Sequence, residues 1–179
     1  MTGKTIIIGI TGSIAAYKAC GIVNILKKDS FDVKVILTKE GAQFVTSLTL
    51  QTLSGNKVLT DMFELPDAWN PVHTSLADSA SLVLIAPATA NVIGKLASGI
   101  LDDLLSCVVY ATKAPVVIAP AMNEKMYNHK IVQENIARLK KIGYSFVGPV
   151  KGHLACGHDA IGRIADISDI AKEVKRLLR

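Results

Sequence analysis

The chain has 179 residues, half of them hydrophobic and only 5% aromatic, and its formal net charge is +5. This length suits one domain with a sizeable core, and the apolar runs are too short for a membrane span or a signal peptide. The basic residues are scattered and no aromatic residues interleave with them, so we expect a single domain over residues 1–179 that binds neither a membrane nor nucleic acid.

Apolar runs and segments of helical periodicity alternate along the chain. We expect strands at 5–10, 32–38, 81–87, 115–119 and 144–147, and helices at 14–28, 42–53, 90–112, 128–141 and 168–179, the last capped by Ser168 or Asp169. This alternation predicts right-handed βαβ units and a parallel sheet that is buried on both faces. The expected fold class is therefore α/β, a Rossmann-like or flavodoxin-like three-layer sandwich. Residues 55–72 are long for a loop, which suggests a functional or intersubunit role.

A glycine turn, Gly9-Ile-Thr-Gly12-Ser13, joins the first expected strand to the first helix. Backbone N–H groups and the helix dipole favour a phosphate at such a turn, although a plain strand–helix connection has the same appearance. The second strand ends in Thr38-Lys39, where a dinucleotide-binding protein usually has Asp or Glu, and Glu40 comes slightly late. We therefore expect a mononucleotide, FMN and not NAD. The segment Thr89-Ala-Asn-Val92 follows the next strand and flanks the same crevice.

The octapeptide Pro120-Ala-Met-Asn-Glu-Lys-Met-Tyr127 is the most informative segment of the chain. It follows a buried strand, so it lies where ligands bind in open α/β sheets, beyond the carboxyl ends of the strands. The amide of Asn123 offers donors and an acceptor without charge, which suits a carboxylate or a carbonyl group. The alternative is that Asn123 only caps a helix.

Three other segments complete a family pattern: residues 12–18 (GSIAAYK), 71–76 (PVHTSL) and 152–163 (GHLACGHDAIGR). Together with the octapeptide they resemble the flavin-dependent cysteine decarboxylases, from the first strand to Arg163. Within that family they are most similar to the branch that acts on 4′-phosphopantothenoylcysteine in coenzyme A synthesis. Ala160 stands where the family usually has Gly, which puts the local backbone of this loop in question.

The resemblance implies roles for individual residues. His73 matches the active-site histidine that acts as a base or polarises the substrate, Asn123 holds the substrate carboxylate, and Cys156 donates a proton. Substrate contacts also fall to Met126, Ala155 and Arg163, and a core-filling role for Met126 stays open. The FMN contacts that the resemblance implies are Gly12, Ser13, Ile14, Thr38, Thr89, Ala90, Asn91, Val92 and Ala121.

The chemistry that the resemblance implies is oxidation of the carbon that bears sulfur, loss of carbon dioxide, and return of hydride with a proton from Cys156. The product would be 4′-phosphopantetheine. Peptidyl-cysteine decarboxylases lack that cysteine, flavin prenyltransferases lack the Asn123 motif, and non-catalytic regulatory relatives have lost a catalytic residue. His153, Cys156 and His158 also suggest part of a metal site, but a closed zinc site needs four ligands, so we expect no metal.

The same resemblance suggests the partners of the chain. We expect a phosphorylated small-molecule substrate and a homo-oligomer, a trimer or a multiple of trimers, with the flavin site between subunits. The odd number of widely spaced cysteines favours a reduced, cytoplasmic protein, with Cys20 and Cys107 as small buried hydrophobes. Phosphopantothenate–cysteine ligase, often fused to such domains, is the expected partner of a stand-alone or trimmed enzyme.

Overall fold

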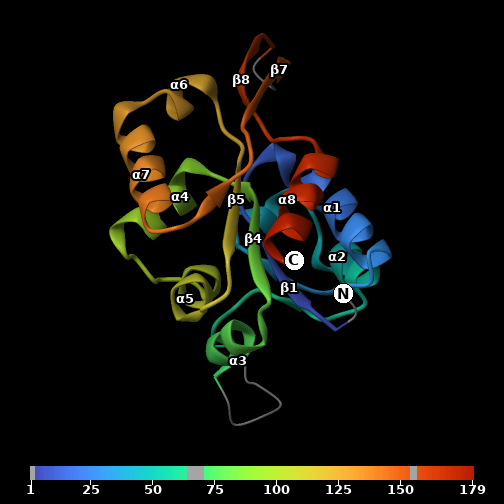
Figure 1. The fold of residues 1–179 in the computed structure, drawn as a ribbon. Coiled ribbons are helices and arrows are strands. Elements are labelled where there is room, and N and C mark those ends of the chain that lie inside the picture. Colours follow the sequence, from blue (N-terminus) through green and yellow to red (C-terminus); the bar gives the residue numbers. More distant parts are fainter. Residues whose placement is uncertain (1–2, 64–70, 154–156) are drawn as a thin grey trace.

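The computed structural model describes residues 3–63, 71–153 and 157–179. Its centre is a six-stranded sheet in the order β3-β2-β1-β4-β5-β6, and every neighbouring pair of strands is parallel (Figure 1). The predicted α/β fold class is thereby confirmed. The strands are β1 (Thr5–Ile10), β2 (Asp32–Leu37), β3 (Val58–Leu59), β4 (Leu82–Ala88), β5 (Val116–Pro120) and β6 (Ser145–Phe146).

Helices cover both faces of the sheet and make it the middle of three layers (Figure 1). One face carries α1 (Tyr17–Lys28), α2 (Ser47–Ser54) and α8 (Ile167–Leu177). The other carries α3 (Val72–Ser79), α4 (Ala90–Ser98), α5 (Leu104–Ala111) and α7 (Lys130–Lys141). Short helices η1 (Ile14–Ala16), η2 (Gly41–Gln43) and α6 (Glu124–Tyr127) begin at the loops after β1, β2 and β5.

The alternation of side chains along each strand divides the core into two parts. Ile6, Ile8 and Ile10 of β1 pack in the core under α1 and α8, while Ile7 packs in the core under α3, α4 and α5, and all four are fully buried. This explains why the strands read as continuous apolar runs in the sequence. None of the described helices is long and apolar enough to cross a membrane.

The topology directs the site to one edge of the sheet. β1 pairs with β2 on one side and with β4 on the other, so the chain reverses its direction of winding between β1 and β4. At such a switch point the loops after the two strands diverge and leave a crevice outside their carboxyl ends. The turn at Gly12 and the segment that begins at Thr89 border this crevice, as the sequence predicted.

The helix predicted over residues 90–112 is in fact two helices. Gly99 adopts the left-handed conformation (φ 72°) and ends α4, and Asp103 caps α5 by accepting a hydrogen bond from the Ser106 N–H at 2.8 Å. The Ser106 hydroxyl in turn accepts a hydrogen bond from the Asp103 N–H at 3.3 Å, which completes a capping box. The uninterrupted apolar pattern on both sides of residues 99–103 concealed this break.

Other expected boundaries are also wrong. The helix predicted over 42–53 is η2 followed by α2, which Thr46 caps. The helix predicted from residue 128 begins at Lys130, after the separate helix α6. The helix predicted from residue 168 begins at Ile167. The residue before α8 is Asp166, so neither Ser168 nor Asp169 is its cap. The last expected strand shrinks to the two residues of β6, and residues 55–72 contain β3 and the start of α3.

The sequence also gave no indication of the antiparallel hairpin formed by β7 (Val150–His153) and β8 (Asp159–Arg163). In Figure 1 this hairpin projects beyond the sheet, beside α6 and at the end of the domain opposite to α3. Its strands alternate intermediate and exposed residues, and apart from Ala160 and Gly162 none is buried, so no apolar periodicity marks them.

The capping box at the start of α5 gives a test of the corrected helix boundary. Asp103→Ala should lower the free energy of unfolding at pH 7 by about 1–2 kcal/mol, because the Ser106 N–H loses its acceptor. Burial raises the pKa of Asp103, but the bonds from Ser106 and Lys95 outweigh it and the pKa is lowered. The carboxylate therefore stabilises the fold above the ordinary aspartate pKa of 3.8, and this contribution disappears as pH falls through the lowered value.

Denaturant unfolding at pH 7 and at pH 3 measures both effects. Asp166→Ala is the matched control, because Asp166 precedes α8 without a side-chain capping bond, and it should cost less at pH 7. Equal losses for the two variants at pH 7, or a loss for Asp103→Ala that does not shrink in acid, would contradict this assignment.

Candidate active site

Three hydroxyl side chains lie just beyond the carboxyl ends of the adjacent strands β1, β2 and β4. The Ser13 hydroxyl accepts a hydrogen bond from the Ala15 N–H (3.3 Å), Thr38 from the Gly41 N–H (3.1 Å) and Thr89 from the Val92 N–H (3.4 Å). A hydroxyl group that accepts one hydrogen bond still has a proton to donate. None of these three hydroxyls donates to an acceptor within the described residues, so each can donate to a ligand in the crevice.

Hydrogen bonds lock the loops of β1, β4 and β5 together. The buried Thr11 hydroxyl donates to the Pro87 carbonyl (2.7 Å) and accepts from the Thr89 N–H (3.1 Å). The Ala121 N–H donates to the Ala88 carbonyl at 3.0 Å, which extends the link to the loop after β5. These bonds fix the relative positions of the glycine turn, the Thr89 segment and the octapeptide.

Gly12 is required by a close approach between two loops. A Cβ atom at this position would lie 2.4 Å from the Cβ of Glu40 and 3.2 Å from its carbonyl carbon. The glycine turn and the residues after β2 are therefore packed together, although Ser13 and Thr38 line different cavities. The sequence reading treated Glu40 only as a displaced ribose-binding acid, and it missed this contact.

A cavity of about 470 Å³ opens where these loops meet the octapeptide and the hairpin. Ser13, Ile14, Ala121, Asn123 and Arg163 all line it, so five of the predicted cofactor and substrate residues share one space. Tyr17 and Lys18 from the start of α1 and His153 from β7 also line the cavity; the sequence assigned no individual role to Tyr17 or Lys18 and suggested His153 only for a metal site. Ile14 and Tyr17 are 58% and 60% exposed, which leaves an apolar wall open to a ligand.

Asn123 serves as a helix cap and also faces the cavity. Its side-chain oxygen accepts a hydrogen bond from the Lys125 N–H at 2.9 Å and so starts α6, while the exposed side chain lines the cavity wall. The predicted capping role is therefore confirmed, and it leaves the side chain at the cavity wall. Met126 is 49% exposed, so the core-filling alternative for that residue is wrong.

The hairpin forms the other side of the cavity through His153, Gly162 and Arg163. The Met122 N–H donates to the Gly162 carbonyl at 3.0 Å, and a Cβ at residue 162 would lie 2.1 Å from the Met122 carbonyl oxygen. Only glycine allows this approach, which attaches β8 to the octapeptide. Arg163 also pairs with Asp166 at 3.3 Å.

Two predicted site residues, Ala155 and Cys156, lie outside the described residues. Ala160 is buried in β8 opposite Gly152, so the backbone accommodates a side chain where the family has Gly. His153 pairs with Asp159 at 3.4 Å and His158 with Glu124 at 3.8 Å. Within residues 3–63, 71–153 and 157–179, no cluster of three or more His, Cys, Asp or Glu side chains could hold a metal ion.

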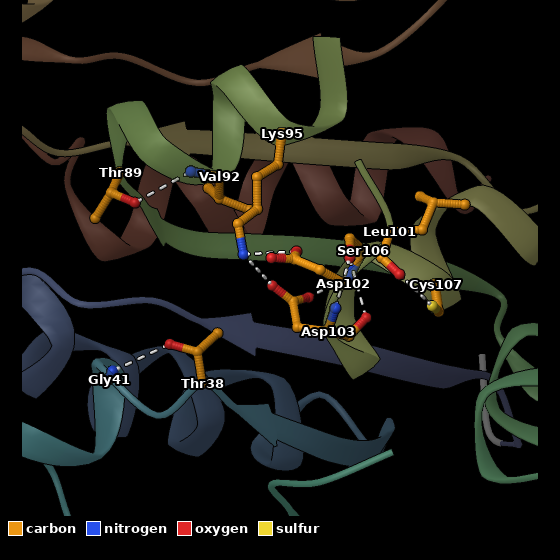
Figure 2. A network of polar contacts seen from close by, with 10 residues as sticks. All are labelled: Thr38, Gly41, Thr89, Val92, Lys95, Leu101, Asp102, Asp103, Ser106 and Cys107. Atoms are coloured by element: carbon orange, nitrogen blue, oxygen red, sulfur yellow. Dashed lines mark hydrogen bonds and ion pairs between the residues drawn. The ribbon is translucent and has the colours of Figure 1, made fainter. Parts of the chain in front are cut away.

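A second cavity, of about 310 Å³, is lined by Thr38, Lys39, Glu40 and Lys95, among others. Figure 2 shows the Lys95 side chain descending from α4 toward Asp102 and Asp103, on the side of the crevice that faces Thr38. Burial alone would lower the pKa of Lys95, but the hydrogen bonds to both carboxylates outweigh it and raise that pKa. The remaining predicted contacts, Ala90, Asn91 and Val92, form the first turn of α4.

His73 lies apart from the other predicted residues. It is in α3, which precedes β4 and therefore lies near the amino ends of the strands, at the opposite end of the domain from α6 and the hairpin (Figure 1). His73 lines neither of the two cavities. Within one copy of the chain, His73 and Asn123 therefore lie at opposite ends of the domain.

Cys20 and Cys107 are free thiols of intermediate burial, so the expectation that both are fully buried was too strong. Burial raises the pKa of each thiol, and for Cys107 the nearby Asp103 and Asp102 raise it further. A thiol with a raised pKa carries little thiolate at neutral pH. Neither residue has the environment of a reactive cysteine.

Comparison with known proteins agrees with this geometry. The Flavoprotein family model matches residues 1–179, and the chain belongs to that family. It is 44% identical to the Coenzyme A biosynthesis bifunctional protein CoaBC of Bacillus subtilis over 96% of this chain and 42% of that protein. It is 41% identical to a probable phosphopantothenoylcysteine decarboxylase of Streptococcus mutans, over 98% of this chain and 99% of that one.

Two solved structures show the same fold over nearly the full chain. A mutant PPC decarboxylase complexed with pantothenoylaminoethenethiol is 28% identical, with a TM-score of 0.84 and coverage of 97% of both chains. The FMN-dependent cysteine decarboxylase SpaF is 27% identical, with a TM-score of 0.86 and coverage of 98% of both chains. The chain spans less than half the length of the bifunctional relatives that it matches.

Proposed function

We propose that this chain is an FMN-dependent decarboxylase that converts 4′-phosphopantothenoylcysteine to 4′-phosphopantetheine in coenzyme A synthesis. The observation that carries the proposal is the shared cavity, in which Asn123 and Arg163 face Ser13, Ile14 and Ala121. A substrate held by the first pair would meet a cofactor held by the others. The relatives named for coenzyme A biosynthesis and as a probable phosphopantothenoylcysteine decarboxylase match 96% and 98% of the chain and support the same assignment.

The hydrogen-bond donors that the protein offers in the crevice suit FMN. The N–H groups of the turn after β1 and the protons of Ser13, Thr38 and Thr89 suit a phosphate and a chain of hydroxyl groups, and no acid follows β2 directly to bind the ribose of a dinucleotide. When bound, FMN supplies a two-electron acceptor and donor beside the substrate. The protein's share is to orient the substrate, to exclude water and to move protons.

The residues around the substrate divide that work. Asn123 orients the carboxylate that will leave, because its amide can donate to an oxygen while its own oxygen stays on the Lys125 N–H. His73 takes or shares a proton near the sulfur-bearing carbon. Cys156 gives a proton to the carbon chain when hydride returns, so that the product leaves as a saturated thiol.

His73 can take part only if another copy of the chain supplies it, because α3 lies at the far end of the domain from the cavity (Figure 1). We therefore propose a homo-oligomer, a trimer or a multiple of trimers, with each site shared between subunits. The enzyme would work in the cytoplasm beside a phosphopantothenate–cysteine ligase, the activity expected of the other part of the bifunctional relatives.

The cofactor assignment is tested by the Thr38→Val variant. Valine keeps the shape but removes the proton offered to the ligand and the acceptor of the Gly41 N–H, so the Kd for FMN should rise about tenfold. Titration of flavin fluorescence measures it, with Thr52→Val on α2 as the control for an exposed hydroxyl. Release of FAD or a nicotinamide nucleotide from purified protein, or an unchanged Kd in Thr38→Val, would contradict the assignment.

Asn123→Asp should reduce turnover about a hundredfold or more while FMN stays bound. Aspartate still caps α6, but its charge repels the substrate carboxylate in a poorly solvated site, a loss on the order of 3 kcal/mol of transition-state stabilisation. Steady-state kinetics measure the loss. Asn128→Asp makes the same chemical change at the other end of α6 and should have little effect. A turnover of Asn123→Asp near that of the wild type would remove this residue from the site.

Cys156→Ser separates the two halves of the reaction. A hydroxyl group is a far weaker acid than a thiol, so the variant should release carbon dioxide, bleach its flavin and accumulate an enethiol in place of the saturated thiol. Mass spectrometry of a single-turnover mixture detects that product, and Cys107→Ser is the control. Saturated thiol formed by Cys156→Ser at the wild-type rate would show that another group donates the proton.

A further inference from the structure

Lys95 is held by two carboxylates at once. Its ammonium group lies 2.7 Å from Asp102 and 2.9 Å from Asp103, and its side chain is only 21% exposed (Figure 2). By contrast, Lys130, Lys172 and Lys175 each pair with one carboxylate. A long, flexible side chain is thus fixed in a single direction, which an ordinary surface pair does not achieve.

The fixed Lys95 side chain belongs to the helix that begins with the predicted flavin-binding turn. Asn91 and Lys95 are four residues apart on α4, so they share one face of that helix. Lys95 lines the 310 Å³ cavity together with Thr38, whose hydroxyl proton is offered to a ligand. Helix α4 therefore carries the predicted flavin-binding turn at its start and, on the face of Asn91, a lysine that shares a cavity with Thr38.

The carboxylates connect α4 to a rigid support. Asp103 caps α5 through the Ser106 N–H, and α5 is buried in the core through Leu105 and Val108, with Leu105 packed over Gly9 of β1. At its other end α4 finishes at Gly99, and the Gly99 and Ile100 N–H groups both donate to the carbonyl of Lys95. A helix of nine residues has little stability of its own, so its position depends on such attachments.

We propose that Lys95 is a positioning residue for the flavin: its pairing with Asp102 and Asp103 fixes α4 so that the turn Thr89–Val92 keeps the geometry that FMN binding needs. The inference rests on the proposed FMN site. Lys95 acts through the helix and need not touch the flavin. If Lys95 lost its charge, Asp102 and Asp103 would repel one another without a counter-ion. Helix α4 would then no longer be held to the start of α5.

The test compares FMN binding with stability in matched variants. Lys95→Met should raise the Kd for FMN about tenfold, a change of about 1.4 kcal/mol, while Lys95→Arg, which keeps both ion pairs, should stay within about twofold of the wild type. Lys175→Met is the control, because Lys175 forms a pair of similar exposure with Asp29 at 3.0 Å, remote from the site on α8. It should leave the Kd unchanged even where it lowers Tm.

Asp102→Asn supplies a variant that keeps Lys95 and the cap of α5. It should raise the Kd for FMN about threefold, and the double variant with Lys95→Met should show less than the sum of the two changes. An unchanged Kd in Lys95→Met, no rescue by Lys95→Arg, or an equal loss in Lys175→Met would overturn the inference. If Lys95→Met does not fold, an unchanged Kd in Asp102→Asn overturns it. A wild-type protein that binds no flavin would instead refute the proposed function.

Discussion

The parallel direction of the strands is the constraint on which the site depends. Because all six strands run the same way, every loop that follows a strand emerges at one edge of the sheet, and every loop that precedes a strand emerges at the other. Ser13, Thr38, Thr89 and Asn123 all follow strands and meet at the first edge. His73 precedes β4 and therefore cannot join them within one copy of the chain.

The side chains proposed to bind the ligand also cap helices. Ser13, Thr89 and Asn123 each satisfy a backbone N–H at the start of a helix, and Thr38 does so for the Gly41 N–H at η2. Accepting that bond uses an oxygen lone pair and fixes the direction of the side chain, while the hydroxyl protons stay available. A cap at a strand–helix turn is thus already oriented toward a ligand, and the two interpretations of Asn123 were never exclusive.

The sequence predicted the β1, β2, β4 and β5 strands because fully buried parallel strands are continuous apolar runs bounded by turn residues. It failed where local signals compete with an apolar pattern, as at Gly99 and Asp103, which divide one expected helix into two. The hairpin strands β7 and β8 were not predicted because they are partly exposed and their sequences have no alternation of apolar and polar residues. Lys95 was missed for another reason: its partners follow in the next loop, and a contact of that kind has no short-range signature.

The account's central claim is that each active site joins His73 of one copy to Asn123 of another. Co-expression of His73→Ala and Asn123→Asp chains with different tags, followed by purification of hybrids that carry both tags, tests it through decarboxylation of 4′-phosphopantothenoylcysteine. Each variant alone should be inactive, whereas a purified trimer that carries both tags should contain both groups in one of its sites, which restores about a third of wild-type turnover. Hybrids without activity, or an active His73→Ala protein on its own, would contradict the account.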